Sequence, residues 1–267
     1  NSLKDFYTRF YAAIPGSRAH SLFCERVFGL DLGQHGFADV GQLKMLLEWL
    51  DLKPGDHALD LGCGDGRISE YLSDLSGAYF TGLDYIDSAI DTARQRTAGK
   101  RDRLDFVAGD LNHLSLADNS FDAVISIDTL YFSEDYAVTL QQMQAALKPG
   151  GKMAILYSHG REPWVPLEKF DRQTLPPENT PAGQALTNLN YAFTARELTA
   201  EEYQLALRRK AVLEELQEMF EAEDNLFLYE NRMGDANGIR EAIEFGLHRR
   251  YLYCVSPLKS RVSPFPA

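Results

Sequence analysis

Short apolar runs alternate with amphipathic segments through the middle of this chain. The apolar runs end at glycine, proline or charged residues, which is typical of buried strands. They predict strands at 57–60, 79–84, 104–108, 121–127, 152–158 and 248–255. Helical periodicity between the earlier runs predicts helices at 66–75, 87–97 and 133–147. Strands that alternate with helices form a parallel sheet covered on both faces, so the expected fold class is α/β with a doubly wound sheet.

The pattern changes on both sides of this alternating block. Residues 1–50 are rich in aromatic side chains and predict helices, whereas residues 159–197 contain five prolines and no clear period. Thr199 to Glu202 matches a capping box and opens a long predicted helix, and a second runs from about 226 to 245. Because open α/β sheets bind ligands beyond their strand carboxyl ends, we expect this block to form a cap there.

The chain therefore divides into five expected segments. They are an N-terminal helical lid at 1–50, a core at 51–158, a helical cap insertion for substrate at 159–246, a final core strand at 247–255 and a flexible tail at 256–267.

Composition narrows the possible partners. The chain has 267 residues and a formal net charge of −12, which argues against nucleic acid or an anionic membrane as the main partner. No window is apolar enough for a membrane span, and the start lacks a signal-peptide pattern. The cysteines Cys24, Cys63 and Cys254 are too widely spaced for a zinc site, so we expect no metal and a cytoplasmic protein.

Four acidic residues follow predicted strand ends. Asp60 leads into the glycine-rich run 62–66 (GCGDG), where glycine lets the backbone approach a ligand closely. Asp84 closes the second strand, about 20 positions later, where a carboxylate can accept hydrogen bonds from ribose hydroxyls. Asp110 follows the third strand and can accept a hydrogen bond from an exocyclic amine, and Asp128 ends the fourth. We therefore expect a negatively lined pocket that suits a cationic, non-phosphorylated nucleoside.

Each acidic residue also has a simpler explanation, since aspartate often forms turns or caps helices. Four of them at one sheet edge with a glycine turn favour a ligand site. For Asp60 and Asp128, the alternative of orienting the loop stays open. Cys63 is expected to fill the loop without a reactive role.

These residues resemble a known family. The run 59–66 (LDLGCGDG) is similar to the first motif of class I S-adenosylmethionine-dependent methyltransferases. Asp84, the Gly109–Asp110 pair and the segments 121–128 and 147–152 are similar to the later motifs, in the same order and spacing. The resemblance covers about residues 40–158 and is closest to enzymes that methylate small molecules. It implies a Rossmann-like, doubly wound seven-strand sheet with S-adenosylmethionine across the strand tips and S-adenosylhomocysteine as the product.

The resemblance also implies roles for individual residues. Gly62 and Gly64 approach the methionine portion, and Asp84 takes the ribose hydroxyls. Residues after the third and fourth strands border the adenine or line the pocket floor: Asp110, Leu111, Ile127 and Asp128. Neighbours of these residues complete the predicted cofactor-binding set: Asp60, Cys63, Tyr85 and Gly109.

Two residues outside those motifs are predicted to be catalytic. His35 lies in a His-Gly-aromatic segment that resembles one ahead of the first motif in several small-molecule and lipid methyltransferases. It is a candidate base or orienting group, and the alternative is a helix cap or a partner of a backbone carbonyl. Tyr131, just after the fourth strand, is predicted to face the reacting methyl, or else to be a core aromatic residue. Weaker candidates are Tyr7, Tyr11, Tyr157, His159, Arg161 and Trp164.

Other functions use similar folds. A nicotinamide-dependent oxidoreductase shares the glycine turn and the strand-two acid, but its fingerprint is G-x-G-x-x-G, and Asp60 would repel a pyrophosphate. A non-catalytic protein that binds S-adenosylmethionine is a second alternative, and a methyltransferase acting on protein or RNA is a third. The acidic charge and the large cap favour an enclosed small-molecule acceptor.

Overall fold

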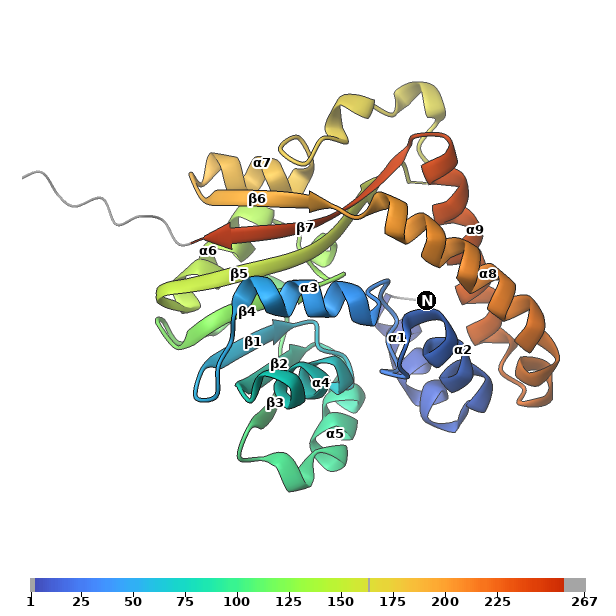
Figure 1. Cartoon of the computed structure of the whole chain (residues 1–267), viewed down its shortest axis with the longest axis horizontal. Coiled ribbons are helices and arrows are strands. Elements are labelled where there is room, and N and C mark those ends of the chain that lie inside the picture. Colours follow the sequence, from blue (N-terminus) through green and yellow to red (C-terminus); the bar gives the residue numbers. More distant parts are fainter. Residues whose placement is uncertain (1–2, 163, 257–267) are drawn as a thin grey trace, which may run out of the picture.

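The computed structural model describes residues 3–162 and 164–256, so the tail predicted at 256–267 lies outside the described residues except for Ser256. Within them, seven strands form one sheet in the order β3-β2-β1-β4-β5-β7-β6 (Figure 1). The strands are β1 His57–Leu61, β2 Tyr79–Asp84, β3 Leu104–Ala108, β4 Phe121–Ile127, β5 Leu147–Gly160, β6 Ala192–Glu197 and β7 His248–Ser256. Strands β1 to β5 are parallel, and β7 runs antiparallel between β5 and β6.

The strand order reverses next to β1. The chain moves from β1 outward to β2 and β3, and then returns to place β4 on the other side of β1. Connections on the two sides of such a point diverge and leave a crevice beyond the strand carboxyl ends, where open α/β sheets bind ligands.

Helices cover both faces of the sheet, because successive strand residues point to opposite sides. Ala58 packs with α3 Val40–Leu50, α4 Arg67–Ser76 and α5 Asp87–Arg96, whereas Leu59 packs with α6 and α7 on the other face. The bounds of those two helices are α6 Tyr136–Ala146 and α7 Pro181–Asn188.

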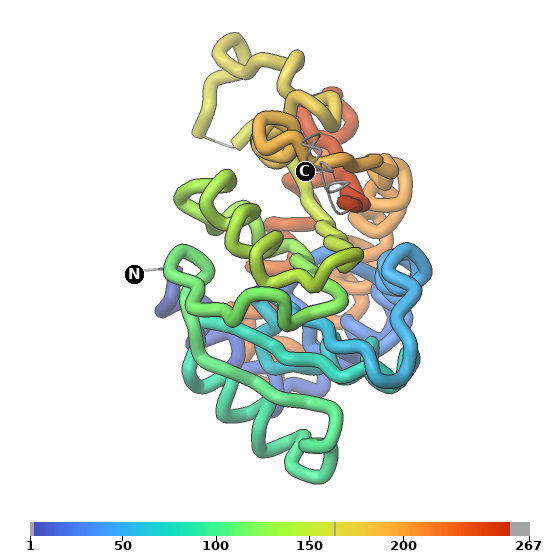
Figure 2. Tube along the Cα trace, turned by 90° about the vertical axis from the view of Figure 1, so that its left-hand side faces the viewer, coloured from blue at the N-terminus to red at the C-terminus, as the bar shows by residue number. Residues whose placement is uncertain are grey.

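Four more helices form a separate group beyond the strand tips. They are α1 Leu3–Ala13, α2 Arg18–Phe28, α8 Thr199–Ala222 and α9 Leu226–Glu244. Buried side chains such as Phe10, Phe23, Leu213 and Phe220 hold them together. Both views place the N-terminal helices beside α8 and α9 (Figures 1 and 2). Helices α1 and α2 of the predicted lid and α8 and α9 of the predicted cap therefore pack as one helical layer over the carboxyl edge of the sheet, whereas α3, α7 and β6 of the same two segments lie in or against the sheet.

Three local expectations were wrong. The irregular segment expected at 159–197 contains β6, a strand with half-exposed and exposed side chains that pairs only with β7. Strand β5 begins at Leu147 rather than at residue 152, with a register shift opposite Phe121 and Ala123. Thr199 and Glu202 form no capping box, because Thr199 accepts a hydrogen bond from the Arg250 amide and Glu202 turns to His248.

Candidate active site

A cavity of about 370 Å³ lies at the carboxyl ends of β1, β2 and β4. Eight of the eleven residues predicted to bind the cofactor line it. They are Gly62, Asp84, Tyr85, Gly109, Asp110, Leu111, Ile127 and Asp128. The other wall is α1, which contributes Leu3, Lys4, Tyr7 and Tyr11. The remaining lining residues are Gly36, Leu83, Asn112, Thr129 and Phe132.

The glycine turn after β1 needs glycine for two reasons. Gly62 and Gly64 have φ values of 78° and 56°, a conformation that other residues rarely adopt. A Cβ atom at Gly62 would overlap the Thr129 side chain, and one at Gly64 would overlap the Tyr11 hydroxyl. Gly64 and Cys63 are not among the residues that line this cavity, and Tyr11 of α1 packs against Gly64.

Asp84 is held rigidly at the cavity wall. Its Oδ2 accepts a hydrogen bond from the Gly64 amide and its Oδ1 accepts one from the Ile86 amide, both at 2.9 Å. Burial raises the pKa of Asp84, although the backbone donors favour the charged form. A carboxylate has about four acceptor sites, so Asp84 can still accept hydrogen bonds from a ligand.

Asp110 and Tyr85 differ from Asp84 in their surroundings. Half of the Asp110 side chain is exposed, and hydrogen bonds from the Asn112 amide and the His113 side chain lower its pKa. The Tyr85 hydroxyl is buried without a protein partner, and burial raises its pKa. Tyr85 can therefore offer a ligand an unused donor and acceptor.

Asp60 points away from the cavity. Its Oδ2 accepts a hydrogen bond of 2.6 Å from the Ser69 hydroxyl on α4, and burial raises its pKa to about 7. Asp60 is not among the residues that line the cavity. The geometry favours the alternative that it orients the glycine loop rather than touching the ligand.

Asp128 faces the cavity, but its negative charge is neutralised by an arginine on the neighbouring part of the sheet. Arg250 of β7 donates to its two carboxylate oxygens at 2.5 and 3.0 Å, and both side chains are buried. Asp128 also accepts a hydrogen bond from the Phe37 amide at 2.8 Å, and its φ of 54° is unusual for a residue other than glycine. Of the four acidic residues expected at this edge of the sheet, Asp128 is therefore ion-paired and Asp60 faces elsewhere, which leaves Asp84 and Asp110 as the negative lining of the cavity.

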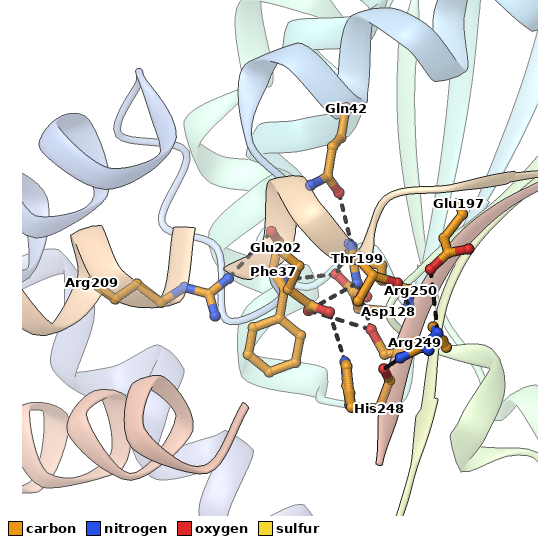
Figure 3. A network of polar contacts seen from close by, with 11 residues as sticks. Phe37, Gln42, Asp128, Glu197, Thr199, Glu202, Arg209, His248, Arg249 and Arg250 are labelled. Carbon is orange, nitrogen blue, oxygen red and sulfur yellow. Dashed lines mark hydrogen bonds and ion pairs between the residues drawn. The ribbon is translucent and has the colours of Figure 1, made fainter. Parts of the chain in front are cut away.

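Arg250 continues into a buried polar network (Figure 3). It donates to Gln42 Oε1 and to the Ser158 hydroxyl, and lies 3.8 Å from Glu202. Glu202 also pairs with His248 at 2.7 Å. Burial alone would raise the pKa of Glu202, but His248, Arg250 and Arg209 overcome it and lower that pKa to about 2.

The loop at 34–37 joins the cavity to the cap. Arg232 of α9 donates to the carbonyls of Gln34 and His35 at 2.5 and 2.6 Å. Arg209 of α8 donates to the Phe37 carbonyl at 3.4 Å and packs against the Phe37 ring. Phe37 therefore bonds Asp128 through its amide and Arg209 through its carbonyl.

The two predicted catalytic residues, His35 and Tyr131, lie among aromatic side chains. His35 contacts the ring of Tyr7, and its Nδ1 is 3.5 Å from the Tyr7 hydroxyl. Burial and Arg232 lower the pKa of His35 well below its usual value, which disfavours a role as general base. Tyr131 packs against Phe132, and burial raises its pKa. Neither side chain lines the larger cavity, although His35 lines a smaller one of about 50 Å³ with Cys63.

The weaker candidates for acceptor contacts fall into two groups, according to whether they line the cavity. Tyr7 and Tyr11 lie at the cavity wall, whereas the remaining four do not line it. Tyr157 bonds the Tyr136 hydroxyl, His159 pairs with Thr174, and Trp164 is 78% exposed. Arg161 donates to the Val165 carbonyl. Sequence reasoning missed Lys4, Asn112 and Arg250, because none of them lies in a motif.

The described residues contain neither a metal-binding cluster nor a membrane-spanning helix. No cluster of three or more His, Cys, Asp or Glu side chains has an arrangement that could hold a metal ion. None of the described helices is long and apolar enough to cross a membrane.

Comparison with known proteins agrees with this geometry. Residues 59–155 match the family described as "Methyltransferase domain". Residues 59–155 therefore form a methyltransferase domain. Phosphoethanolamine N-methyltransferase of Triticum aestivum is 30% identical over 174 residues, which cover 64% of this chain and 33% of that protein. The domain is also 34% identical over 134 residues to 2-phytyl-1,4-naphtoquinone methyltransferase of Nostoc punctiforme, covering 49% of this chain and 56% of that protein.

The chain spans about a third of the length of the plant relative. Among solved structures, Haemonchus contortus phosphoethanolamine N-methyltransferase 2, in complex with phosphomonomethylethanolamine and S-adenosylhomocysteine, has a TM-score of 0.76 at 19% identity. That match covers 96% of this chain and 60% of the other. The cyclopropane synthase MmaA2 of Mycobacterium tuberculosis matches with a TM-score of 0.72 at 14% identity, covering 96% and 98%. These neighbours share the fold of the methyltransferase domain, and the nicotinamide alternative has no support among them.

Proposed function

We propose that this chain transfers a methyl group from S-adenosylmethionine to a small-molecule acceptor enclosed between the strand tips and the helical cap. One observation carries the proposal: the cavity at the switch point of the sheet has Asp84 in its wall and helix α1 across its opening. The cofactor, when bound, supplies an electrophilic methyl group on a sulfonium.

The residues present fit this cofactor. Asp84 keeps free acceptor sites for ribose hydroxyls, and the Tyr85 hydroxyl is buried without a partner beside it. Gly109 and Asp110 line the cavity side by side, and a Cβ atom at Gly109 would come within 2.9 Å of the Leu83 side chain, so glycine is needed there. Tyr7 and Tyr11 of α1 exclude water from the opposite side, as methyl transfer requires.

The acceptor side belongs to residues 1–50 and 159–246, which we propose act together as lid and cap over the core at 51–158 and 247–255. His35 and Tyr131 are proposed to position the acceptor. The net charge of −12 supports a small acceptor rather than nucleic acid, and the scattered cysteines support a cytoplasmic location.

Calorimetric titration with S-adenosylhomocysteine, S-adenosylmethionine and NAD tests the cofactor. We expect the first two to bind and NAD to give no heat. Asp84→Asn should weaken binding about tenfold to a hundredfold, because a buried charged acceptor becomes neutral. Asp91→Asn, on the exposed face of α5, is the matched control and should bind normally. Binding of NAD without S-adenosylmethionine, or unchanged affinity in folded Asp84→Asn, would overturn the assignment.

A further inference from the structure

The cofactor cavity and the smaller cavity of about 50 Å³ are neighbours. Four residues line both of them: Tyr11, Gly36, Gly62 and Ile127. Of these four, only Tyr11 has a polar side chain. Its hydroxyl lies against the glycine turn, since a Cβ atom at Gly64 would overlap it. Tyr11 of α1 therefore lies where the two cavities meet.

The Tyr11 hydroxyl has no hydrogen-bond partner within the described part of the chain. It is not among the fully enclosed polar atoms of that part either, so it keeps surface that a ligand can reach. Ring contacts with Phe10 and Tyr7, at centroid distances of 5.3 and 6.4 Å, hold the side chain in place. Burial, and after it the charges of Asp84 and Asp65, raise the pKa of Tyr11, so the hydroxyl keeps its proton at neutral pH. The cavity wall thus contains a fixed, unused hydrogen-bond donor.

Two further donors lie at the smaller cavity. Gln34 lines it and is only 4% exposed, and its Nε2 has no hydrogen-bond partner. Helix α4 begins beside the cavity after Gly66, which provides no side-chain cap, and a helix N-terminus favours a negative group. The carboxylate that lines this cavity, Asp65, is already paired with Arg67 at 3.0 Å. This end of the crevice therefore suits a ligand group that accepts hydrogen bonds.

The larger cavity has the opposite character. Asp84 and Asp110 line it and do not line the smaller one, and carboxylates accept hydrogen bonds from hydroxyls and amines. A ligand that extends across both cavities is matched when it has donors at one end and an anionic acceptor at the other. The nucleoside of S-adenosylmethionine carries the donors, and its amino-acid end carries a carboxylate. The smaller cavity, at about 50 Å³, has room for a group of that size, because one water takes about 30 Å³.

We propose that the Tyr11 hydroxyl donates a hydrogen bond to the carboxylate at the amino-acid end of the cofactor. The proposal rests on the proposed function of the site and adds a cofactor-binding residue from outside the sheet. Because Tyr11 belongs to α1, this contact joins that helix to the bound cofactor. A nucleoside without the amino-acid end leaves the hydroxyl unpaired. Tyr11 therefore distinguishes the complete cofactor from its nucleoside part.

Calorimetry on the full chain with three ligands tests this role. S-adenosylhomocysteine has the whole amino-acid end, its decarboxylated form keeps only the amine, and 5′-methylthioadenosine lacks both groups. Tyr11→Phe removes the hydroxyl and keeps the ring. We expect it to weaken S-adenosylhomocysteine about tenfold, as loss of one hydrogen bond to a charged group does, and to leave the other two ligands unchanged. Thermal unfolding without ligand should match that of the original chain, because the hydroxyl bonds no described residue.

Two other tyrosine variants serve as controls. Tyr71→Phe, on α4, lines neither cavity and should bind all three ligands like the original chain. Tyr7 lines the larger cavity but not the smaller one, so any loss in Tyr7→Phe should be the same for all three ligands.

The results that would overturn the proposal are distinct. In Tyr11→Phe, an unchanged affinity for S-adenosylhomocysteine, or an equal loss for all three ligands, would remove the hydroxyl from the amino-acid end. A loss shared by the decarboxylated form alone would place the hydroxyl at the amine and contradict the contact with the carboxylate. If S-adenosylhomocysteine does not bind to the original chain, the proposed function fails instead.

Discussion

The two sides of the site satisfy their buried carboxylates in different ways. On the cofactor side, Asp84 accepts hydrogen bonds from the backbone amides of Gly64 and Ile86, which lie within 20 residues of it. At the junction with the cap, Asp128 of the same cavity wall relies on the side chain of Arg250, which is 122 residues away in the chain. One carboxylate is fixed by loops that follow adjacent strands, and the other by a strand that joins the sheet last in chain order.

One part of the site is formed by neighbouring strands, and the other forms only when distant segments of the chain pack together. Backbone amides at strand tips are in place once β1 and β2 pair, and they carry no full charge that needs a partner. The cap side brings full charges into the interior, where each ion is costly until its partner arrives. The acceptor side should therefore depend on docking of α8, α9 and β7, whereas the cofactor side depends on the central strands.

Arg250→Met should have the largest effect on stability. It leaves Asp128 buried without a counterion, and loss of one partner of a buried pair costs about 3–5 kcal/mol. Chemical denaturation followed by circular dichroism gives the free energy of unfolding. The double variant Asp128→Asn/Arg250→Met removes both charges and should recover part of the loss. A loss of unfolding free energy below about 1 kcal/mol would show that this buried ion pair contributes no more than a surface ion pair.

Glu202→Gln should have a smaller effect that depends on pH. The folded pKa is lowered from 4.5 to about 2, so the contribution of Glu202 to stability is complete above pH 4.5 and is lost as pH falls toward 2. The shift corresponds to about 3 kcal/mol at pH 7.

The groups that face Glu202 are His248, Arg250, Arg209 and the Ser158 hydroxyl. Unfolding free energies of both proteins, measured from pH 7 down to 3.5, should converge as the pH falls. The exposed neighbour Glu201→Gln is the control and should show no such convergence. A difference that stays constant over this range would mean that packing, rather than charge, explains the loss.

Arg240→Ala should have the smallest effect. Arg240 pairs with Glu244 at 2.9 Å near the end of α9, four residues apart and partly exposed. Such pairs contribute about 0.3–0.5 kcal/mol, and salt screens them. Thermal melts at low and high salt should show a small loss that vanishes in high salt. A loss comparable to that of Arg250→Met would break the distinction between buried and exposed pairs.

Local sequence was sufficient for the central sheet. Strands β2, β3 and β4 have the predicted bounds, because an apolar run between turn residues determines a buried parallel strand. The glycine turn and Asp84 were found for the same reason, since ligand approach needs particular residues at fixed spacing. Asp84 lines the cavity, and its contact with the ribose stays a prediction.

The cap side could not be predicted in this way. Thr199 to Glu202 satisfies a capping-box pattern, but tertiary partners on β7 take both side chains. Nothing near Arg250 in the sequence marks it as the counterion of Asp128. β6 was missed because half-exposed edge strands lack an apolar run. These features depend on residues brought together from distant segments, which no local pattern encodes.

The backbone of Phe37 connects the wall of the cofactor cavity to the cap. Its amide bonds Asp128 in the wall of the cofactor cavity and its carbonyl bonds Arg209 in the cap, so one peptide segment is anchored at both ends. A ligand that orders either anchor restricts the other. Such coupling is thermodynamically reciprocal: if an acceptor tightens cofactor binding by some factor, the cofactor must tighten acceptor binding by the same factor. The order in which the two ligands bind is then a matter of kinetics alone.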